Sequence, residues 1–454
     1  MTDTVAARAL PDDVLEGILG RLPARSLAAS RRVCKAWRDL VDDRRLLLRH
    51  LLPHSVRGLF VSNYIYYYYR QHFLARPAPA AEEGGPRIDG EFSFIVREEP
   101  FVSHHILDHC NGLVLSSGEH LGGSRMYVCN PTTRRWARLP PAPHYNHRRP
   151  KHRTFLVFDP AVSPAQWEVL MAPPEPHKET AKADMEPEKR TMEWPPATWR
   201  WSALSSTAME WEEKVFVREG EAAGTVADLL MKHSLDDQFL PRWRYGAYCQ
   251  GALYVHCRGE YVSRLCLSTN RYRVIKSPID LTECQEGAVS SIGRSGNGVC
   301  FAALDNMTRL RVWTLNESGD ETEWLLKHDS VVMTKCERQR RCDGPWTIDA
   351  TRDYDRQSKD DEQVSQEDNR DWNSDDDANI LDDTADENDW VRTDVDFLLG
   401  FHPYKEVIFL GDLGDSAFAY HLNSTKVQYL GELNPGYNHG LFDSFVYTPC
   451  LIGV

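Results

Sequence analysis

The stretch from Leu10 to Val41 constrains this chain most, because apolar residues at helical spacing follow a clear helix start. Pro11 with Asp12 and Asp13 is typical of such a start, since proline is tolerated there and the helix dipole favours acids. The apolar residues that follow lie three or four positions apart and predict one buried face; they are Val14, Leu15, Ile18, Leu19 and Leu22.

Two further helices are predicted after Pro23 ends the first. Ser26 is placed to cap a second helix through Leu27. A third apolar stripe comprises Val33, Trp37, Leu40 and Val41, and the leucine-rich stretch from Asp42 to Leu52 is expected to continue as helix. Three short helices in about forty residues are marginally stable alone, so their surplus apolar surface predicts a partner.

The order of these residues resembles the F-box. The match rests on Leu10-Pro11 before acids, Arg21-Leu22-Pro23, Ser26-Leu27, and Val33-Cys34-Lys35 with Trp37-Arg38. The resemblance implies docking on a Skp-type adaptor and through it on a cullin, while the rest of the chain selects substrates. By position it implies adaptor-facing or core roles for Leu10, Pro11, Val14, Ile18, Leu22, Leu27, Val33, Cys34 and Trp37. A plain helical hairpin packed on its own domain explains fewer of these fixed offsets.

Composition indicates a soluble protein with room for two or three domains in 454 residues. The N-terminus lacks the layout of a signal peptide, and no apolar run has the length of a membrane span. Eleven cysteines without paired spacing favour a reducing compartment. We therefore expect the protein in the cytoplasm, the nucleus or both, with no membrane partner.

From Phe92 onward, two short sequence patterns recur and predict β-structure. In one, an apolar strand ends in an Asn- or Asp-centred turn before an aromatic strand, as in Tyr127 to Trp136; in the other, glycine precedes an apolar strand, as in Cys110 to Leu115. Together they describe a four-stranded antiparallel unit, and copies recur at the roughly 40–50-residue spacing of propeller blades. A pair of β-sandwiches also has regular short strands, but the linked repetition favours a propeller.

The β region resembles the F-box-associated or kelch-like propellers of plant F-box proteins. The residues are Asn130-Pro-Thr-Thr with Trp136, Phe158-Asp159-Pro160, and Leu253-Tyr254-Val255-His256. The predicted fold is mainly β with a small α-helical N-terminal domain: a three-helix F-box over 8–52, then a β-propeller of about six blades over 57–454 that recognises substrates. The final strand near Phe445 is expected to pair near Leu59 and close the ring.

Two insertions are predicted within the blades. Residues 173–196, rich in Pro, Glu and Lys, are expected to form a mobile loop. Residues 350–390 carry 16 acidic side chains against 4 basic ones, which accounts for −12 of the net charge of −14. This acidic insertion is expected to be disordered, because it has little to bury.

No catalytic, metal or cofactor site is predicted. Asp375, Asp377 and Asn379 begin like a calcium loop, but Ile380 stands where a glycine is required. His104, His105, His109 and Cys110 lack a second half-site for zinc, so strand residues are the preferred interpretation. Tyr64–Tyr69 have few basic neighbours, which favours a strand and turn over nucleic-acid stacking.

The predicted function is therefore that of a non-catalytic receptor subunit of a Skp-cullin-F-box ubiquitin ligase, whose protein target the sequence does not identify. One alternative is a binding or scaffold module that uses the adaptor without degradation. Another is a propeller glycan hydrolase, which requires paired carboxylates.

Overall fold

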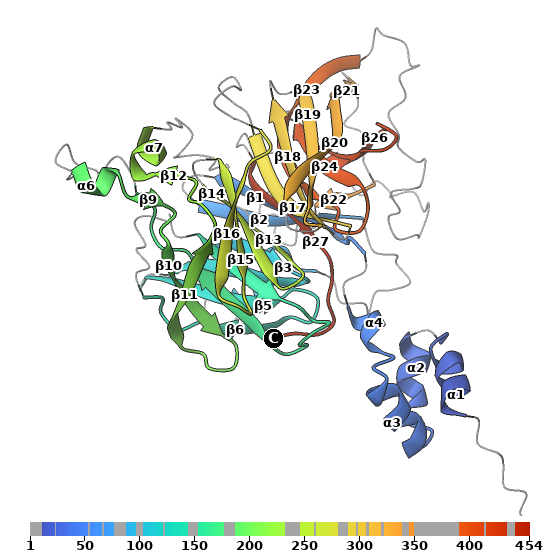
Figure 1. Cartoon of the computed structure of the whole chain (residues 1–454). Coiled ribbons are helices and arrows are strands. Elements are labelled where there is room, and N and C mark those ends of the chain that lie inside the picture. Colours follow the sequence, from blue (N-terminus) through green and yellow to red (C-terminus); the bar gives the residue numbers. More distant parts are fainter. Residues whose placement is uncertain are drawn as a thin grey trace, which may run out of the picture.

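The protein consists of a small helical unit beside a ring of antiparallel sheets (Figure 1). The computed structural model describes residues 11–22, 24–52, 55–65, 68–76, 88–96, 103–120, 123–143, 153–176, 187–231, 246–257, 260–279, 289–296, 298–305, 308–318, 322–337, 345–348, 390–412, 415–433 and 441–454. The predicted disorder of the acidic insertion falls on 350–389, outside these residues, and Trp390 already begins a strand.

The helical unit contains α1 (Asp12–Leu19), α2 (Ala24–Ser30), α3 (Lys35–Asp43) and α4 (Leu48–Leu51). Its core consists of Leu15, Leu19, Leu27, Leu40 and Val41. Two local predictions were wrong. Ser26 lies inside α2 rather than at its start, and the helix expected over 42–52 is interrupted because Arg45 adopts a left-handed conformation with φ 49°.

Six antiparallel blades of four strands account for most of the described strands. From the innermost strand outward, the first blade is β27 (Leu441–Tyr447), β1 (Gly58–Ile65), β2 (Tyr68–Ala75) and β22 (Thr347–Ile348); the second is β3 (Ser103–Cys110), β4 (Leu113–His120), β5 (Gly123–Asn130) and β6 (Arg135–Arg138); the third is β7 (Thr154–Phe158), β8 (Trp167–Met171), β10 (Thr198–Ser205) and β11 (Trp211–Glu219). The fourth is β13 (Gly246–Cys249), β14 (Ala252–Cys257), β15 (Tyr261–Cys266) and β16 (Arg271–Lys276); the fifth is β17 (Val289–Ser295), β18 (Gly298–Asp305), β19 (Arg309–Asn316) and β20 (Glu323–Val331); the sixth is β23 (Trp390–Phe401), β24 (Val407–Asp412), β25 (Ser416–His421) and β26 (Val427–Glu432).

A hydrophobic core fills the space between each pair of neighbouring blades. Because side chains alternate along a strand, one strand serves two cores. On β1, Leu59 and Val61 pack toward the sixth blade, whereas Phe60 packs toward the second. This arrangement is a propeller, so the predicted fold class is confirmed and the alternative of two β-sandwiches does not fit.

The ring is closed by the C-terminal strand, as the sequence predicts. β27 pairs antiparallel with β1, so that Leu59 lies opposite Val446 and Phe60 opposite Phe445. The first blade thus combines strands from both ends of the chain. It also takes up β22, a strand that the sequence did not reveal.

The two recurring sequence patterns correspond to the turns of the blades. Asn111-Gly112 and Gln250-Gly251 join an innermost strand to its neighbour, and all four residues have positive φ, as a two-residue type I′ turn requires. In the second blade, the Asn130 side chain accepts hydrogen bonds from the backbone N–H groups of Thr132 and Thr133, at 3.1 and 3.2 Å.

The third and fourth blades are joined at their outer edges. β11 pairs with β16 in parallel, which merges both blades into one eight-stranded sheet. The remaining elements are α5 (Ser93–Val96), α6 (Pro187–Arg190), β9 (Glu193–Trp194), β12 (Gly224–Thr225), α7 (Val226–Met231) and β21 (Met333–Glu337). Of the predicted mobile loop over 173–196, residues 177–186 lie outside the described ranges, whereas the rest contains α6 and β9.

The helical unit is attached to the ring through the C-terminal tail. The backbone N–H of Leu451 donates to the carbonyl of Leu51, at the end of α4, over 2.9 Å. The thiol of Cys450 donates to the same carbonyl at 3.5 Å. Figure 1 accordingly shows the chain end on the side of the ring that faces the helices.

Candidate functional site

Helix α1 presents apolar side chains to solvent as well as to its own core. Leu15 and Leu19 are buried, whereas Val14 and Ile18 are each 48% exposed. Residues four apart share one helix face, so Val14 and Ile18 form a pair. Val33, which precedes α3, is 64% exposed. The unit exposes these apolar side chains although it also has polar residues that could occupy the surface. Exposed apolar residues that lie together are typical of a protein-docking surface.

The nine residues predicted to be adaptor-facing or core separate into two groups. Pro11, Val14, Ile18, Val33 and Cys34 are exposed, and we call these five residues the helical docking surface. Leu27 is fully buried, and Leu22 and Trp37 pack partly buried against the core. Leu10 lies outside the described residues. Direct contact with a partner is therefore expected of the first group, whereas Leu27 maintains the fold.

Ion pairs connect the helices at the polar side of this unit. Arg44 approaches Glu16 at 3.4 Å and Asp13 at 4.0 Å, which links α1 to the end of α3. Arg31 pairs with Asp42 at 2.8 Å. All these side chains are at least one-third exposed, so each pair contributes at most about 1 kcal/mol. Apolar packing therefore accounts for most of the stability of the unit.

A cavity of about 120 Å³ lies at the centre of the ring, which we call the channel cavity. Innermost strands of the first, second, fourth, fifth and sixth blades contribute to its lining. The polar lining residues are Asp108, His109, Asn111, Ser291, Arg294, Tyr248, Tyr404, Ser444 and Thr448. Asp108 is the only carboxylate among the described lining residues, whereas glycoside hydrolysis requires two. The cavity therefore gives no support to the hydrolase alternative.

Burial controls the ionisation of two side chains that line the channel cavity. Burial raises the pKa of Asp108 to about 7, and the negative charge of the nearby Asp443 adds to this increase. Hydrogen bonds from the backbone of Leu156 and His109 lower the same pKa, but their effect is smaller than that of burial. The Leu156 N–H donates to the Asp108 carboxylate at 2.7 Å. Burial also lowers the pKa of His109 to about 4, so this imidazole is neutral at physiological pH.

Replacing Asp108 with Asn is expected to change how stability depends on pH. The folded protein binds the Asp108 proton more tightly than the unfolded chain, whose carboxyl pKa is about 3.9, so wild-type stability falls as pH rises from about 4 to about 7. The amide of the Asp108→Asn variant has no charge to bury, so the stability of this variant relative to wild type should rise from pH 5 to pH 8. Melting temperatures of both proteins across this range test the prediction.

The contribution of His109 is common to both proteins and cancels in this comparison. Asp329→Asn is the control, because Arg309 lowers the pKa of the exposed Asp329 and its titration ends below this pH range. Parallel melting curves for Asp108→Asn and wild type would show that Asp108 does not titrate as described.

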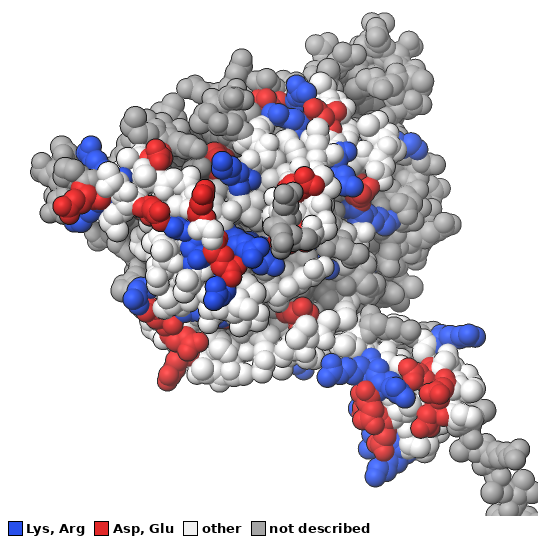
Figure 2. Space-filling view, viewed as in Figure 1, with Lys and Arg blue, Asp and Glu red and all other residues white. Residues whose placement is uncertain are grey.

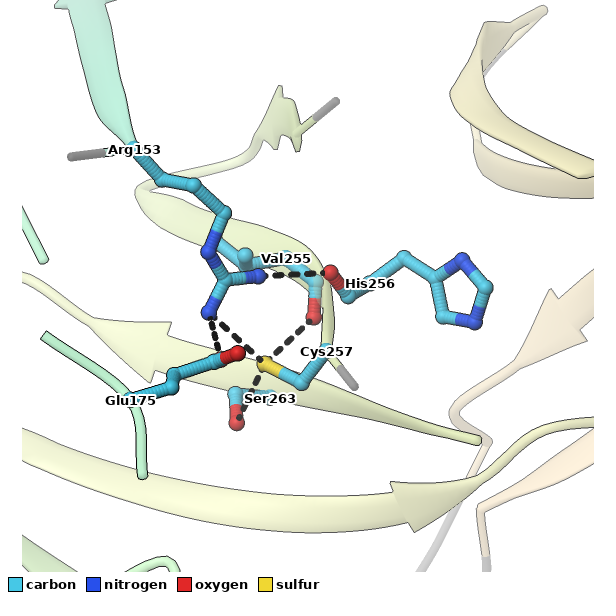
Figure 3. Close-up of polar contacts among 6 residues, drawn as sticks. All are labelled: Arg153, Glu175, Val255, His256, Cys257 and Ser263. Atoms are coloured by element: carbon cyan, nitrogen blue, oxygen red, sulfur yellow. Dashed lines mark hydrogen bonds and ion pairs between the residues drawn. The ribbon is translucent and has the colours of Figure 1, made fainter. Parts of the chain in front are cut away.

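A buried ion pair flanks the third blade, and its arginine also contacts the fourth blade (Figure 3). The Arg153 guanidinium contacts the carboxylate of Glu175, and their side chains are only 12% and 8% exposed. Arg153 also donates to the carbonyl of His256 at 2.9 Å and lies 3.9 Å from the Cys257 thiol. Burial raises the pKa of Cys257, which keeps its thiol protonated and unreactive. The cluster is therefore a structural contact rather than a nucleophilic site.

Substituting Arg153 with Met should destabilise the propeller by about 3–5 kcal/mol, because it leaves the Glu175 carboxylate buried without its cation. Urea unfolding followed by tryptophan fluorescence measures the loss. Arg200→Met is the matched control, since Arg200 pairs with Glu213 in an exposed position and should cost at most about 1 kcal/mol. Equal midpoints for the two variants would contradict the assignment.

The residues considered for zinc lie in the packing of the second blade. The ring of His104 is buried between those of Phe92 and Tyr127. Cys110 is buried, and its thiol donates to the carbonyl of Phe158 at 3.3 Å. Within the described part of the chain, no group of three His, Cys, Asp or Glu side chains has a metal-binding arrangement. None of its helices is long and apolar enough to cross a membrane.

Charges of both signs are interleaved on the visible face of the propeller (Figure 2). Along the junction of β11 and β16, Glu219 pairs with Arg271 at 3.2 Å and with Arg273 at 2.8 Å. Nucleic-acid binding requires a basic surface with excess positive charge. This face therefore does not favour nucleic acid as a partner.

Comparison with known proteins identifies the helical unit. A family model described as F-box-like matches residues 7–53. A probable F-box protein of Arabidopsis thaliana is 33% identical over 135 residues, which cover 29% of this chain and 31% of that protein. The F-box protein ETP2 of the same plant is 34% identical over 134 residues (28% and 34%), and an F-box/LRR-repeat/kelch-repeat protein is 29% identical over 141 residues (30% and 34%).

The chain thus spans about a third of the length of these curated relatives. One chain of a crystal structure of the mitotic checkpoint complex has a TM-score of 0.32 at 9% identity, with coverage of 74% of this chain and 80% of that one. A score this low supports no further conclusion.

The fold and these matches define a class: an F-box-like domain followed by a β-propeller. The resemblance to plant F-box proteins, some of them with kelch repeats, is confirmed. F-box proteins generally act as substrate receptors rather than enzymes, and their F-box typically binds a Skp1-type adaptor.

Proposed function

We propose that this chain is the substrate-recognition subunit of a Skp-cullin-F-box ubiquitin ligase. The observation that carries the proposal is the exposure of Val14 and Ile18 on α1, whose opposite face packs into the core of the helical unit. These side chains gain about 1.5–3 kcal/mol each when a partner covers them. The F-box-like match at 7–53 supports a Skp-type adaptor as that partner.

The proposed mechanism is positional. The helical docking surface holds the adaptor, and through it the cullin, while the propeller holds a target protein. Holding both raises the effective concentration of target lysines near the ubiquitin-transferring subunits. The hydrogen bonds between the C-terminal tail and Leu51 support this role, because they restrict the motion of one unit relative to the other. In this proposal the chain forms no covalent bond itself, needs no cofactor and works in the cytoplasm or nucleus.

Co-purification tests the first step. The full chain is expressed with a Skp-type adaptor and a cullin, and we expect the three to elute as one complex. A chain that elutes without the adaptor would contradict the proposal.

The second step separates a degradation receptor from a scaffold that uses the same adaptor. Proteins captured by the full chain should accumulate when the proteasome is inhibited. If captured proteins keep constant abundance and carry no ubiquitin, the scaffold function is the correct one.

A further inference from the structure

The channel cavity contains a cation without a counter-ion. Arg294, at the end of β17, is only partly exposed, and no carboxylate among the described residues pairs with it. Its Nη1 lies 3.5 Å from the Asn111 side-chain oxygen, and its buried Nε–H has no acceptor in the described structure. By contrast, Arg264 pairs with Glu317 at 2.7 Å and Arg309 with Asp329 at 2.8 Å.

An unpaired guanidinium in such a position costs free energy, since burial removes water that would otherwise solvate it. The protein nevertheless holds it in place. Asn111 has φ 46° in a tight turn, and its side-chain NH2 donates to the carbonyl of Phe158 at 2.6 Å, which fixes the oxygen that faces Arg294. A positive charge that is held in place without a counter-ion among the described residues is available to a ligand anion.

The neighbouring groups narrow the class of anion. Tyr248 lines the cavity, and burial raises its pKa to about 12, so its phenol stays neutral. Asp108 also lines the cavity, and its carboxylate disfavours a ligand with two negative charges more than a ligand with one. One guanidinium among neutral hydroxyl and amide groups suits a single carboxylate, which arginine binds through two parallel hydrogen bonds.

Size restricts what can enter. The volume of about 120 Å³ is several times the roughly 10–15 Å³ that one water requires by the same measure, so a side chain fits. The inner strands keep this space narrow: a Cβ on Gly293 would overlap the ring of Phe401, and one on Gly400 would lie 2.8 Å from the Val446 side chain.

We propose that the channel cavity is a carboxylate-binding subsite in which Arg294 captures one acidic side chain of the target protein. This inference rests on the proposed function in one respect: the proposed function is what makes the ligand part of a target protein. The binding site itself belongs to the propeller and does not depend on the helical docking surface.

Binding of short peptides to the full chain tests the subsite. The probes are acetyl-Gly-Glu-Gly-amide, its Gln counterpart and inorganic phosphate, measured by saturation-transfer NMR. We expect the Glu peptide to bind wild type at least tenfold more tightly than the Gln peptide, and to bind Arg294→Met at least tenfold more weakly. Arg294→Lys should retain part of the affinity, because it keeps the charge but not the paired donors.

Arg309→Met is the matched control, since Arg309 lies on the same blade but outside the cavity, and it should bind like wild type. Equal affinity of wild type for the Glu and Gln peptides overturns the proposal without use of any variant. Unchanged binding by Arg294→Met overturns it as well, and tighter binding of phosphate than of the Glu peptide overturns the carboxylate assignment. Arg294→Met should still capture the Skp-type adaptor, whereas a wild type that captures none contradicts the proposed function alone.

Discussion

Deleting residues 445–454 is expected to abolish the folded propeller. This truncation removes the end of β27, the innermost strand of the first blade, and leaves Gly58, Leu59 and Phe60 of β1 without their partners on that strand. Phe445, Val446 and Tyr447 are all less than 7% exposed. Phe445 and Val446 alone contribute about 3–6 kcal/mol, a large part of the roughly 5–15 kcal/mol by which a domain is stable.

Contacts between the deleted residues and the second blade add to this effect. The Asn130 side chain donates to the carbonyls of Cys450 and Ile452, at 3.0 and 3.1 Å, and the Tyr447 hydroxyl donates to the carbonyl of Gly112 at 3.1 Å. The deletion therefore loosens the second blade as well as the first. It also exposes part of the edge of β1, which promotes aggregation.

Thermal unfolding and size-exclusion chromatography measure the outcome. The truncated chain should elute as aggregate and show no cooperative transition. Deleting residues 2–9 is the control, because it shortens the other end and leaves every described strand in place. A truncated chain that melts at the wild-type temperature would mean that the ring does not depend on its C-terminal strand.

Replacing Val14 and Ile18 together with Asp is expected to weaken adaptor binding at least about 100-fold. Each apolar side chain contributes about 1.5–3 kcal/mol when covered, an unpaired carboxylate in the interface costs more, and every 1.4 kcal/mol changes affinity about tenfold. Both side chains are half exposed in the free protein, so the helical core remains intact. Surface plasmon resonance with the immobilised adaptor measures the affinity, and circular dichroism checks the fold.

Leu325→Asp with Leu326→Asp is the matched control. These side chains are 40% and 54% exposed on β20, the outer strand of the fifth blade, so the chemical change is the same at another surface. The control should bind the adaptor like wild type. If both double variants bind equally well, the adaptor does not use α1.

Local spacing in the sequence was enough to predict several elements. Leu15 and Leu19 recur at helical spacing and enter the core of the helical unit, as predicted. Asn111-Gly112 and Asn130 fix the turns of a blade through positive φ and side-chain hydrogen bonds, which are properties of a few neighbouring residues. The apolar C-terminal strand near Phe445 was also sufficient to predict how the ring closes.

The packing of helices and blades, which local spacing does not reveal, selects the predicted residues that are exposed and the distant residues that meet. Leu27 and Val33 look alike as apolar residues of one motif, yet one is buried and the other exposed, because helix packing rather than spacing selects the covered face. Arg294 and Asn111 lie 183 positions apart and meet only because their blades share the channel. Nothing in the sequence around Arg294 indicates that it lacks a counter-ion, since charge pairing depends on contacts between blades.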